Sequence, residues 1–274
     1  MVELRQATLK GEIFKYFDVG EGQPILFLHG ALGDLRIWQG HCEALSARYR
    51  CIGYTQRYFG ADRWSDGGPP FGVATHAEDL IGFVEALGLG PVYLVAWSYS
   101  GHVALQAVLR RPDLFRRAIV YEPGVPTYVS TPQEMDAFRK NAQAIYGPMA
   151  AAVGKGDLEG AARVLIDGSG GNGYFDRQRS EYQTITRDNL PSLPRLMAQE
   201  PPPNITCEDL AALKVPVSIV HGSRTLPIFA IPSRAAARCI RNARHMEVPD
   251  VGHLWPQEDP RGFAAIIEEL DRAT

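Results

Sequence analysis

The chain has 274 residues, of which 45% are hydrophobic and 22% charged, with a formal net charge of −3. This composition is typical of a soluble globular protein, and the weakly acidic balance gives no electrostatic reason to expect a nucleic-acid partner. No run approaches the roughly 18 apolar residues of a membrane span, and the first residues lack the basic start and apolar stretch of a signal peptide. We therefore expect a cytoplasmic protein without a membrane span.

Strands and helices are expected to alternate along most of the chain. Two β-like runs open it as a hairpin, and the apolar run that follows them is typical of a strand buried on both faces of a parallel sheet. The expected strands are Leu4–Thr8, Ile13–Val19, Pro24–His29, Tyr49–Tyr54, Pro91–Trp97, Ala118–Glu122, Val215–Val220 and Arg244–Val248. The expected helices are Leu35–Arg48, Thr75–Leu87, Gly101–Arg111 and Gly262–Arg272. This alternation predicts a mostly parallel sheet.

One region, from about Val125 to Ala212, shows helical patterns and no convincing strand. Its best helices are Glu134–Val153, Asp157–Ile166 and Asp176–Arg187. Three prolines at 201–203 form a stiff connector back toward the sheet. We predict an α/β core from residues 1–124 and 213–274, with residues 125–212 inserted as a helical cap.

The strongest chemical signal is the stretch Leu-Val-Ala-Trp-Ser-Tyr-Ser-Gly-His at residues 94–102. A buried strand runs into Ser98 and a helix follows at once, as in a nucleophile elbow, where a sharp turn projects the serine hydroxyl from the sheet. The residues two before and two after the serine must be small, and here they are Ala96 and Ser100. Two alternatives stay open: Ser98 only caps the helix, or Ser100 is the nucleophile.

Two further segments fit an elbow serine. The loop after the strand ending at His29 would supply one backbone N–H to an oxyanion hole and the residue after the serine a second, which makes Ala31 and Tyr99 the candidates. The glycines of that loop also fit a plain strand-to-helix turn. Past the last strand, His253 lies in a loop from which it could act as the base for Ser98.

These landmarks, in this order, resemble the α/β-hydrolase superfamily along nearly the whole chain. They are His29-Gly30, the Ser98 elbow, Glu122-Pro123, His221-Gly222 and the Asp250–His253 loop. The resemblance implies an eight-stranded, mostly parallel sheet flanked by helices, with an inserted helical cap. Within the superfamily the chain is similar to cap-bearing small esterases, C–C bond hydrolases, perhydrolases and haloalkane dehalogenases.

The third member of the triad departs from the usual pattern. The family's acid is commonly an Asp shortly after the strand ending in His-Gly, and here Thr225 occupies that position. The resemblance to certain haloalkane dehalogenases points instead to Glu122, which would fix the tautomer of His253. Two alternatives stay open: Glu122 is a structural carboxylate, or Asp250 is the acid.

Other sequence features have simpler explanations. The segment Gly168–Gly173 fits G-x-G-x-x-G but follows a helix instead of a strand, so we interpret it as a flexible loop and not a dinucleotide site. The arginines of Arg57–Arg63 could bind an anion, although such residues are more often structural. No metal-ligand cluster appears, and we expect neither a metal nor a cofactor. The cysteines, at 42, 51, 207 and 239, argue against a disulfide framework at this density.

The sequence thus predicts a serine hydrolase that cleaves a small carboxylic ester or related acyl bond of a small-molecule substrate. The elbow serine argues against epoxide hydrolase or dehalogenase activity, which in this superfamily uses an aspartate there. Two alternatives stay open. One is hydrolysis of the C–C bond of a diketone-type substrate, and the other is a non-catalytic small-molecule binding protein on the same scaffold.

Overall fold

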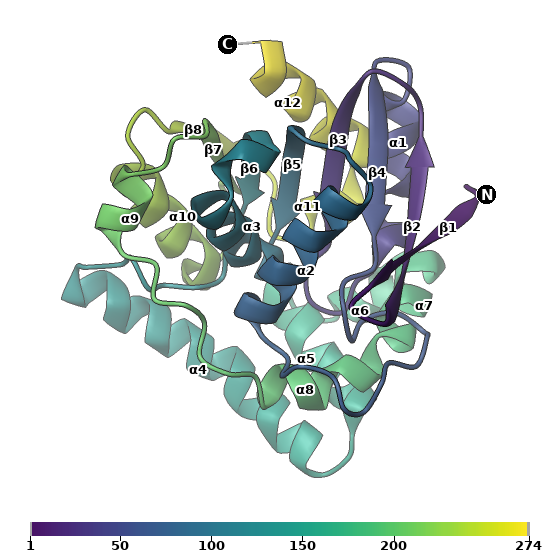
Figure 1. Cartoon of the computed structure of the whole chain (residues 1–274). Coiled ribbons are helices and arrows are strands. Elements are labelled where there is room, and N and C mark those ends of the chain that lie inside the picture. Colours follow the sequence, from purple (N-terminus) through teal and green to yellow (C-terminus); the bar gives the residue numbers. More distant parts are fainter. Residues whose placement is uncertain (1, 273–274) are drawn as a thin grey trace.

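A computed structural model describes residues 2–272, and eight strands form one sheet in the order β1-β2-β4-β3-β5-β6-β7-β8 (Figure 1). The first hairpin and the β2–β4 pair are antiparallel, and the other neighbours are parallel. The strands are β1 (Leu4–Leu9), β2 (Glu12–Val19), β3 (Gln23–Leu28), β4 (Tyr49–Tyr54), β5 (Val92–Trp97), β6 (Phe115–Tyr121), β7 (Val217–Gly222) and β8 (Arg244–Val248). The predicted mostly parallel eight-stranded sheet is confirmed.

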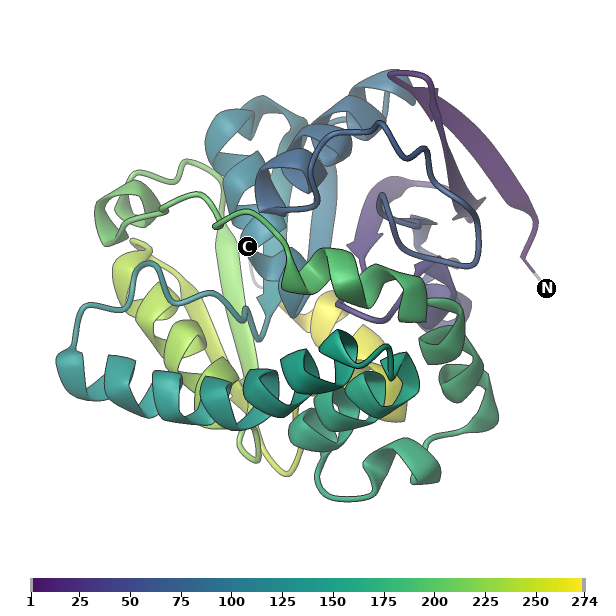
Figure 2. The same cartoon turned by 90° about the horizontal axis from the view of Figure 1, so that it is seen from below.

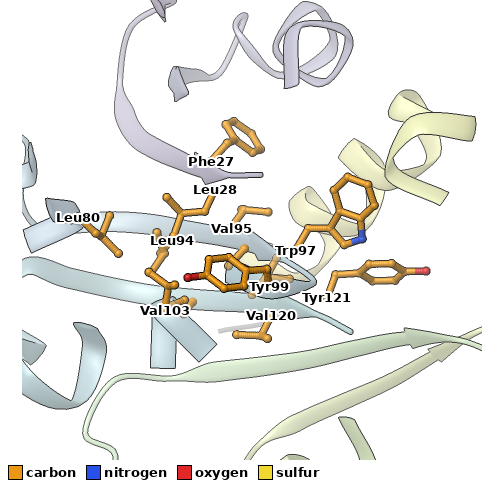
Figure 3. Packing of buried hydrophobic residues seen from close by; sticks show 14 of the residues in the cluster. Phe27, Leu28, Leu80, Leu94, Val95, Trp97, Tyr99, Val103, Val120 and Tyr121 are labelled. Carbon is orange, nitrogen blue, oxygen red and sulfur yellow. The ribbon is translucent and has the colours of Figure 1, made fainter. Parts of the chain in front are cut away.

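Helices cover both faces of this sheet, which explains why its central strands are apolar on both sides. Helices α1 (Gln39–Leu45) and α12 (Pro260–Arg272) pack against each other behind the sheet in Figure 1, and α2 (Val73–Ala86) and α3 (Tyr99–Arg110) pack together in front. Figure 3 shows Phe27 of β3, Leu94 and Val95 of β5 and Val120 of β6 in the resulting core.

One expectation about the helices of the core needs correction, and one helix of the core was missed. The expected helix Leu35–Arg48 is a 3-10 turn, η1 (Leu35–Trp38), followed by the short α1. The side chain of Asp34 caps that turn by accepting from the N–H of Arg36. Helix α10 (Pro227–Cys239) was not expected at all, because prolines at 227 and 232 interrupt its pattern.

Helices α4 to α9 lie between β6 and β7 in the chain, and Figure 2 shows them across one end of the sheet. They are α4 (Pro132–Gly154), α5 (Leu158–Gly170), α6 (Tyr174–Arg177), α7 (Ser180–Asp188), α8 (Leu193–Met197) and α9 (Cys207–Ala211), with a 3-10 turn η3 (Leu190–Ser192) before α8. Two short elements lie outside this segment: the 3-10 turn η2 (Pro112–Leu114) precedes β6, and α11 (Trp255–Glu258) precedes α12. The expected helix Asp176–Arg187 is broken at Gln178. Gly168 and Gly170 belong to α5, so the loop interpretation of that glycine segment was wrong for its first half.

A disulfide joins Cys207 of α9 to Cys239 at the end of α10. The sequence argued against a disulfide framework, and the chain indeed has a single bridge among its described residues, but the bridge itself was not expected. Cys42 and Cys51 are buried free thiols. The bridge ties the end of the helical segment to a helix that follows β7.

Candidate active site

Ser98 lies on the sharp turn between β5 and α3, with φ 59° and ψ −121°. A non-glycine residue at positive φ is uncommon, and such backbone strain concentrates at functional sites. The turn is tightly packed: a Cβ on Gly101 would lie 2.8 Å from Cγ1 of Val120 and 2.9 Å from Cβ of Pro123. A glycine is therefore required at position 101, three residues after the serine, where α3 meets β6.

Ser98, His253 and Glu122 lie in one hydrogen-bonded line. Nε2 of His253 is 2.9 Å from Oγ of Ser98, and Nδ1 of His253 is 2.7 Å from Oε2 of Glu122. The tautomer that satisfies both contacts carries its proton on Nδ1, donates it to Glu122 and accepts from the serine hydroxyl. Loops after three different strands (β5, β6 and β8) bring these side chains together.

The carboxylate of Glu122 is fully buried and accepts from two further donors. The backbone N–H of Gly222 donates to Oε1 at 2.8 Å, and the hydroxyl of Thr225 donates to Oε2 at 2.7 Å. Asp250, the alternative acid, pairs instead with Arg224 on the surface, where its side chain is 80% exposed. Of the two candidate acids, the structure brings Glu122 to His253.

Ser100, the alternative nucleophile, is fully buried and donates its hydroxyl to the carbonyl of His29. The Nδ1–H of His29 donates to the carbonyl of Gly30, and its Nε2 accepts from the N–H of Gln56 at 3.0 Å. Burial lowers the pKa of His29 to about 4, so the ring stays neutral near pH 7. His29 and Ser100 thus join the end of β3 to the elbow.

Ala31 and Tyr99 both line a cavity together with Ser98. The hydroxyl of Tyr99 donates to Nδ1 of His76 at 2.7 Å, and Nε2 of His76 donates to the carbonyl of Arg57 at 3.0 Å. Burial lowers the pKa of His76 to about 3, which keeps it neutral and able to accept from Tyr99. These bonds hold the side chain of Tyr99, the residue after Ser98 whose backbone N–H is an oxyanion-hole candidate.

Arg57 has a structural role in this network. Its guanidinium is 2% exposed and forms a two-point ion pair with Asp79, at 2.6 and 2.8 Å. For Arg57 the structure therefore favours the structural interpretation over binding of an anion, because a bidentate pair already occupies this guanidinium.

The cavity has a volume of about 400 Å³ and lies between the Ser98 turn and the helical segment. Of the described residues that line it, none is Asp, Glu, Lys or Arg. The lining consists of Gly30, Ala31, Val73, Trp97, Ser98, Tyr99, Gly124, Val125, Pro126, Tyr146, Met149, Leu165, Ile166, Ser169, Leu196, Met197, Gln199, Pro202, Phe229, His253, Leu254 and Gln257. Mostly apolar pockets with a few placed polar groups are typical of small-molecule sites.

Phe229 is a site residue that the sequence did not reveal. Its ring stacks flat on His253, with ring centroids 3.5 Å apart and an interplanar angle of 3°. Phe229 lies on α10, the helix that was not predicted from the sequence. Nε1 of Trp97 also donates to the carbonyl of His253 at 3.0 Å and holds its loop.

A profile of the Alpha/beta hydrolase family matches residues 25–266. The chain belongs to this family. Ethanol acetyltransferase 1 of Kluyveromyces lactis is 30% identical over 117 residues, which cover 40% of this chain and 31% of that protein. The match thus spans less than a third of that relative.

Two solved structures cover the fold more fully. A thermophilic esterase from Thermogutta terrifontis has a TM-score of 0.76 at 22% identity, covering 99% of this chain and 98% of its own. A meta-cleavage product hydrolase has a TM-score of 0.75 at 21% identity, covering 98% of each chain. At these identities the two likenesses show the shared fold.

Proposed function

We propose that this hydrolase-family protein cleaves a small carboxylic ester or related acyl bond through an acyl-enzyme on Ser98. The observation that carries the proposal is the line from Ser98 through His253 to Glu122, with both hydrogen bonds under 3 Å, at the wall of an apolar cavity. A fold alone hosts many chemistries, so the assignment depends on this geometry.

His253 accepts the hydroxyl proton of Ser98 at Nε2 as Oγ attacks the acyl carbon. The oxyanion that forms is stabilised by the backbone N–H groups of Ala31 and Tyr99. The imidazolium then gives its proton to the departing alcohol, which leaves an ester on Oγ. Water, deprotonated by His253, attacks that ester and releases the acid, and the proton returns to Ser98. Glu122 holds the imidazole in the required tautomer throughout.

The helices of residues 125–212 act in this proposal as a cap over the sheet. Tyr146 and Met149 of α4, Leu165 and Ile166 of α5 and Leu196 of α8 line the cavity opposite the elbow. Substrate choice would therefore depend on the helical segment, while the reaction would depend on the core.

Rapid mixing with a p-nitrophenyl ester tests the acyl-enzyme. We expect a burst of nitrophenol equal to the enzyme concentration whenever deacylation is the slower step, and an acyl adduct on Ser98 after acid quench. Ser98→Ala should show neither. A protein that cleaves a vinylogous diketone but no ester would instead be the C–C hydrolase. Binding of either compound without turnover would indicate the non-catalytic alternative.

We propose the cytoplasm as the compartment. Disulfides are rare there, so this proposal requires the Cys207–Cys239 bridge of the structure to be reduced in the cell. Among the described residues no helix is long and apolar enough to cross a membrane. The Cys207–Cys239 pair, with Cα atoms 5.0 Å apart, provides the test. Rapid alkylation of intact cells should modify both thiols; a pair that is fully protected before reduction would place the protein in an oxidising compartment.

A further inference from the structure

Besides Ser98 and His253, the polar side chains of the cavity lining include Tyr99, Tyr146, Ser169, Gln199 and Gln257. The hydroxyl of Tyr99 is already bonded to His76. Ser169 already donates its hydroxyl to the carbonyl of Leu165 at 2.8 Å. Gln257 differs from Tyr146 and Gln199 because its side chain is both deeply buried and held in place. It is 5% exposed and lies on α11, directly after the His253 loop.

Two contacts fix Gln257. Its Oε1 accepts from Nε2 of Gln178 at 3.0 Å, and its backbone carbonyl accepts from Nη2 of Arg179 at 2.8 Å. Gln178 is itself only 8% exposed. The carbonyl end of the Gln257 amide is therefore occupied by the protein.

The Nε2 group of Gln257 has no acceptor among residues 2–272. This Nε2 group is not among the inaccessible unpaired atoms, and its residue lines the cavity, so the donor can be reached by a bound ligand. A donor without a protein partner in a mostly apolar cavity favours a ligand that supplies an acceptor. Sites with polar groups of this kind discriminate strongly against analogues that lack the matching atom.

We propose that Gln257 is a specificity-determining residue whose amide N–H binds a second acceptor oxygen of the substrate, away from the scissile bond. The inference rests on the proposed ester hydrolysis. It defines the substrate class as uncharged, mainly apolar esters or lactones that carry an additional carbonyl or ether oxygen. The hydrocarbon part lies against Met149, Leu165 and Ile166. A carboxylate is excluded, because it would lose its hydration in a cavity that offers no opposite charge.

Matched pairs of p-nitrophenyl esters test this assignment. Each pair consists of a plain alkanoate and an analogue in which one remote CH2 is replaced by C=O, and the series moves that carbonyl along the chain. Rates are normalised to hydroxide-catalysed hydrolysis of the same ester. We expect at least one oxo ester to exceed its partner by roughly tenfold in kcat/KM. An analogue ending in a carboxylate should be turned over far more slowly than either.

Gln257→Met keeps the length of the side chain and removes its donor, so the preferred ratio should fall to about one. Gln133→Met, the same change at an exposed position at the start of α4, should keep the wild-type ratio. Because Gln257→Met also leaves Gln178 without its partner, the double variant Gln178→Met/Gln257→Met separates folding from specificity. It removes both amides and should show the same loss of preference.

A preference absent at every carbonyl position, or one that survives in Gln257→Met, would overturn the assignment. Calorimetric binding to Ser98→Ala, with the methyl esters of the same acids, measures the ratio without turnover. A binding preference in a protein that cleaves no ester would refute the proposed function and keep the Gln257 site. Ester cleavage without any preference for the oxo esters would support the proposed function and refute the role of Gln257.

Discussion

The hydroxyl of Thr225 donates a hydrogen bond to Oε2 of Glu122 at 2.7 Å. Thr225 stands where the resemblance to the family placed an aspartate, and Glu122 is the carboxylate that reaches His253. The two positions that could carry the acid are thus in direct contact. If Glu122 is the acid, as we propose, the threonine at the usual position orients it by this hydrogen bond.

Glu122→Gln should lower kcat/KM by about 10³–10⁴, because an amide disturbs the tautomer and the charge that His253 needs. Adding Thr225→Asp should recover at least tenfold of this loss. The side chain of residue 225 already contacts Oε2 of Glu122, the atom that His253 binds, so a carboxylate at residue 225 would lie near His253. Steady-state kinetics on a soluble p-nitrophenyl ester measures both. Asp250→Asn is the matched control and should behave like the wild type.

Phe229→Leu should lower kcat/KM by about 3- to 30-fold. Face-to-face stacking is a poor arrangement for two neutral rings but a good one for a cation over an aromatic face, worth about 0.5–2 kcal/mol. The flat contact with His253 therefore favours the imidazolium that forms during the reaction. Phe229→Tyr keeps the aromatic face and should retain most of the activity. Equal losses in both variants would show that the ring only fills space.

Gly222→Ala should destabilise the protein by about 1–3 kcal/mol and reduce activity as well. A Cβ at this position would collide with the backbone carbonyl of Val251, in the loop that carries His253. The same residue donates its N–H to Glu122. Urea unfolding and ester kinetics measure the two effects. Gly154→Ala, where a new Cβ meets nothing within 4 Å, is the control and should leave stability unchanged or slightly raised.

Acid should destabilise the fold through buried histidines. Burial lowers the pKa of His41 to about 3 from its ordinary value of 6.5. Between these values the unfolded chain binds a proton that the folded chain does not, so the free energy of unfolding falls as pH falls from 6.5 toward 3. This loss is at most about 1.4 kcal/mol per pH unit for one such group. His41→Phe should lose less stability than the wild type between pH 6.5 and 4.5 in urea titrations. An unchanged slope would contradict this reasoning.

Local pattern was sufficient to predict the strands, because a buried central strand is a short apolar run whatever its neighbours. It also identified the elbow, whose steric demands act within a few residues of Ser98. The pairing of Glu122 with Thr225, the stack of Phe229 on His253 and the Cys207–Cys239 bridge join residues that are distant in sequence. These contacts depend on strand order and on α10, whose prolines mask its helical pattern.

Reaction with a fluorophosphonate, followed by peptide mass spectrometry, tests the central claim most directly. An activated serine reacts with this probe because its hydroxyl loses a proton to the neighbouring base as it attacks phosphorus. We expect one adduct, on Ser98, which is lost in His253→Ala and strongly reduced in Glu122→Gln. An adduct on Ser100, or an unlabelled protein whose cavity demonstrably admits the probe, would contradict the mechanism.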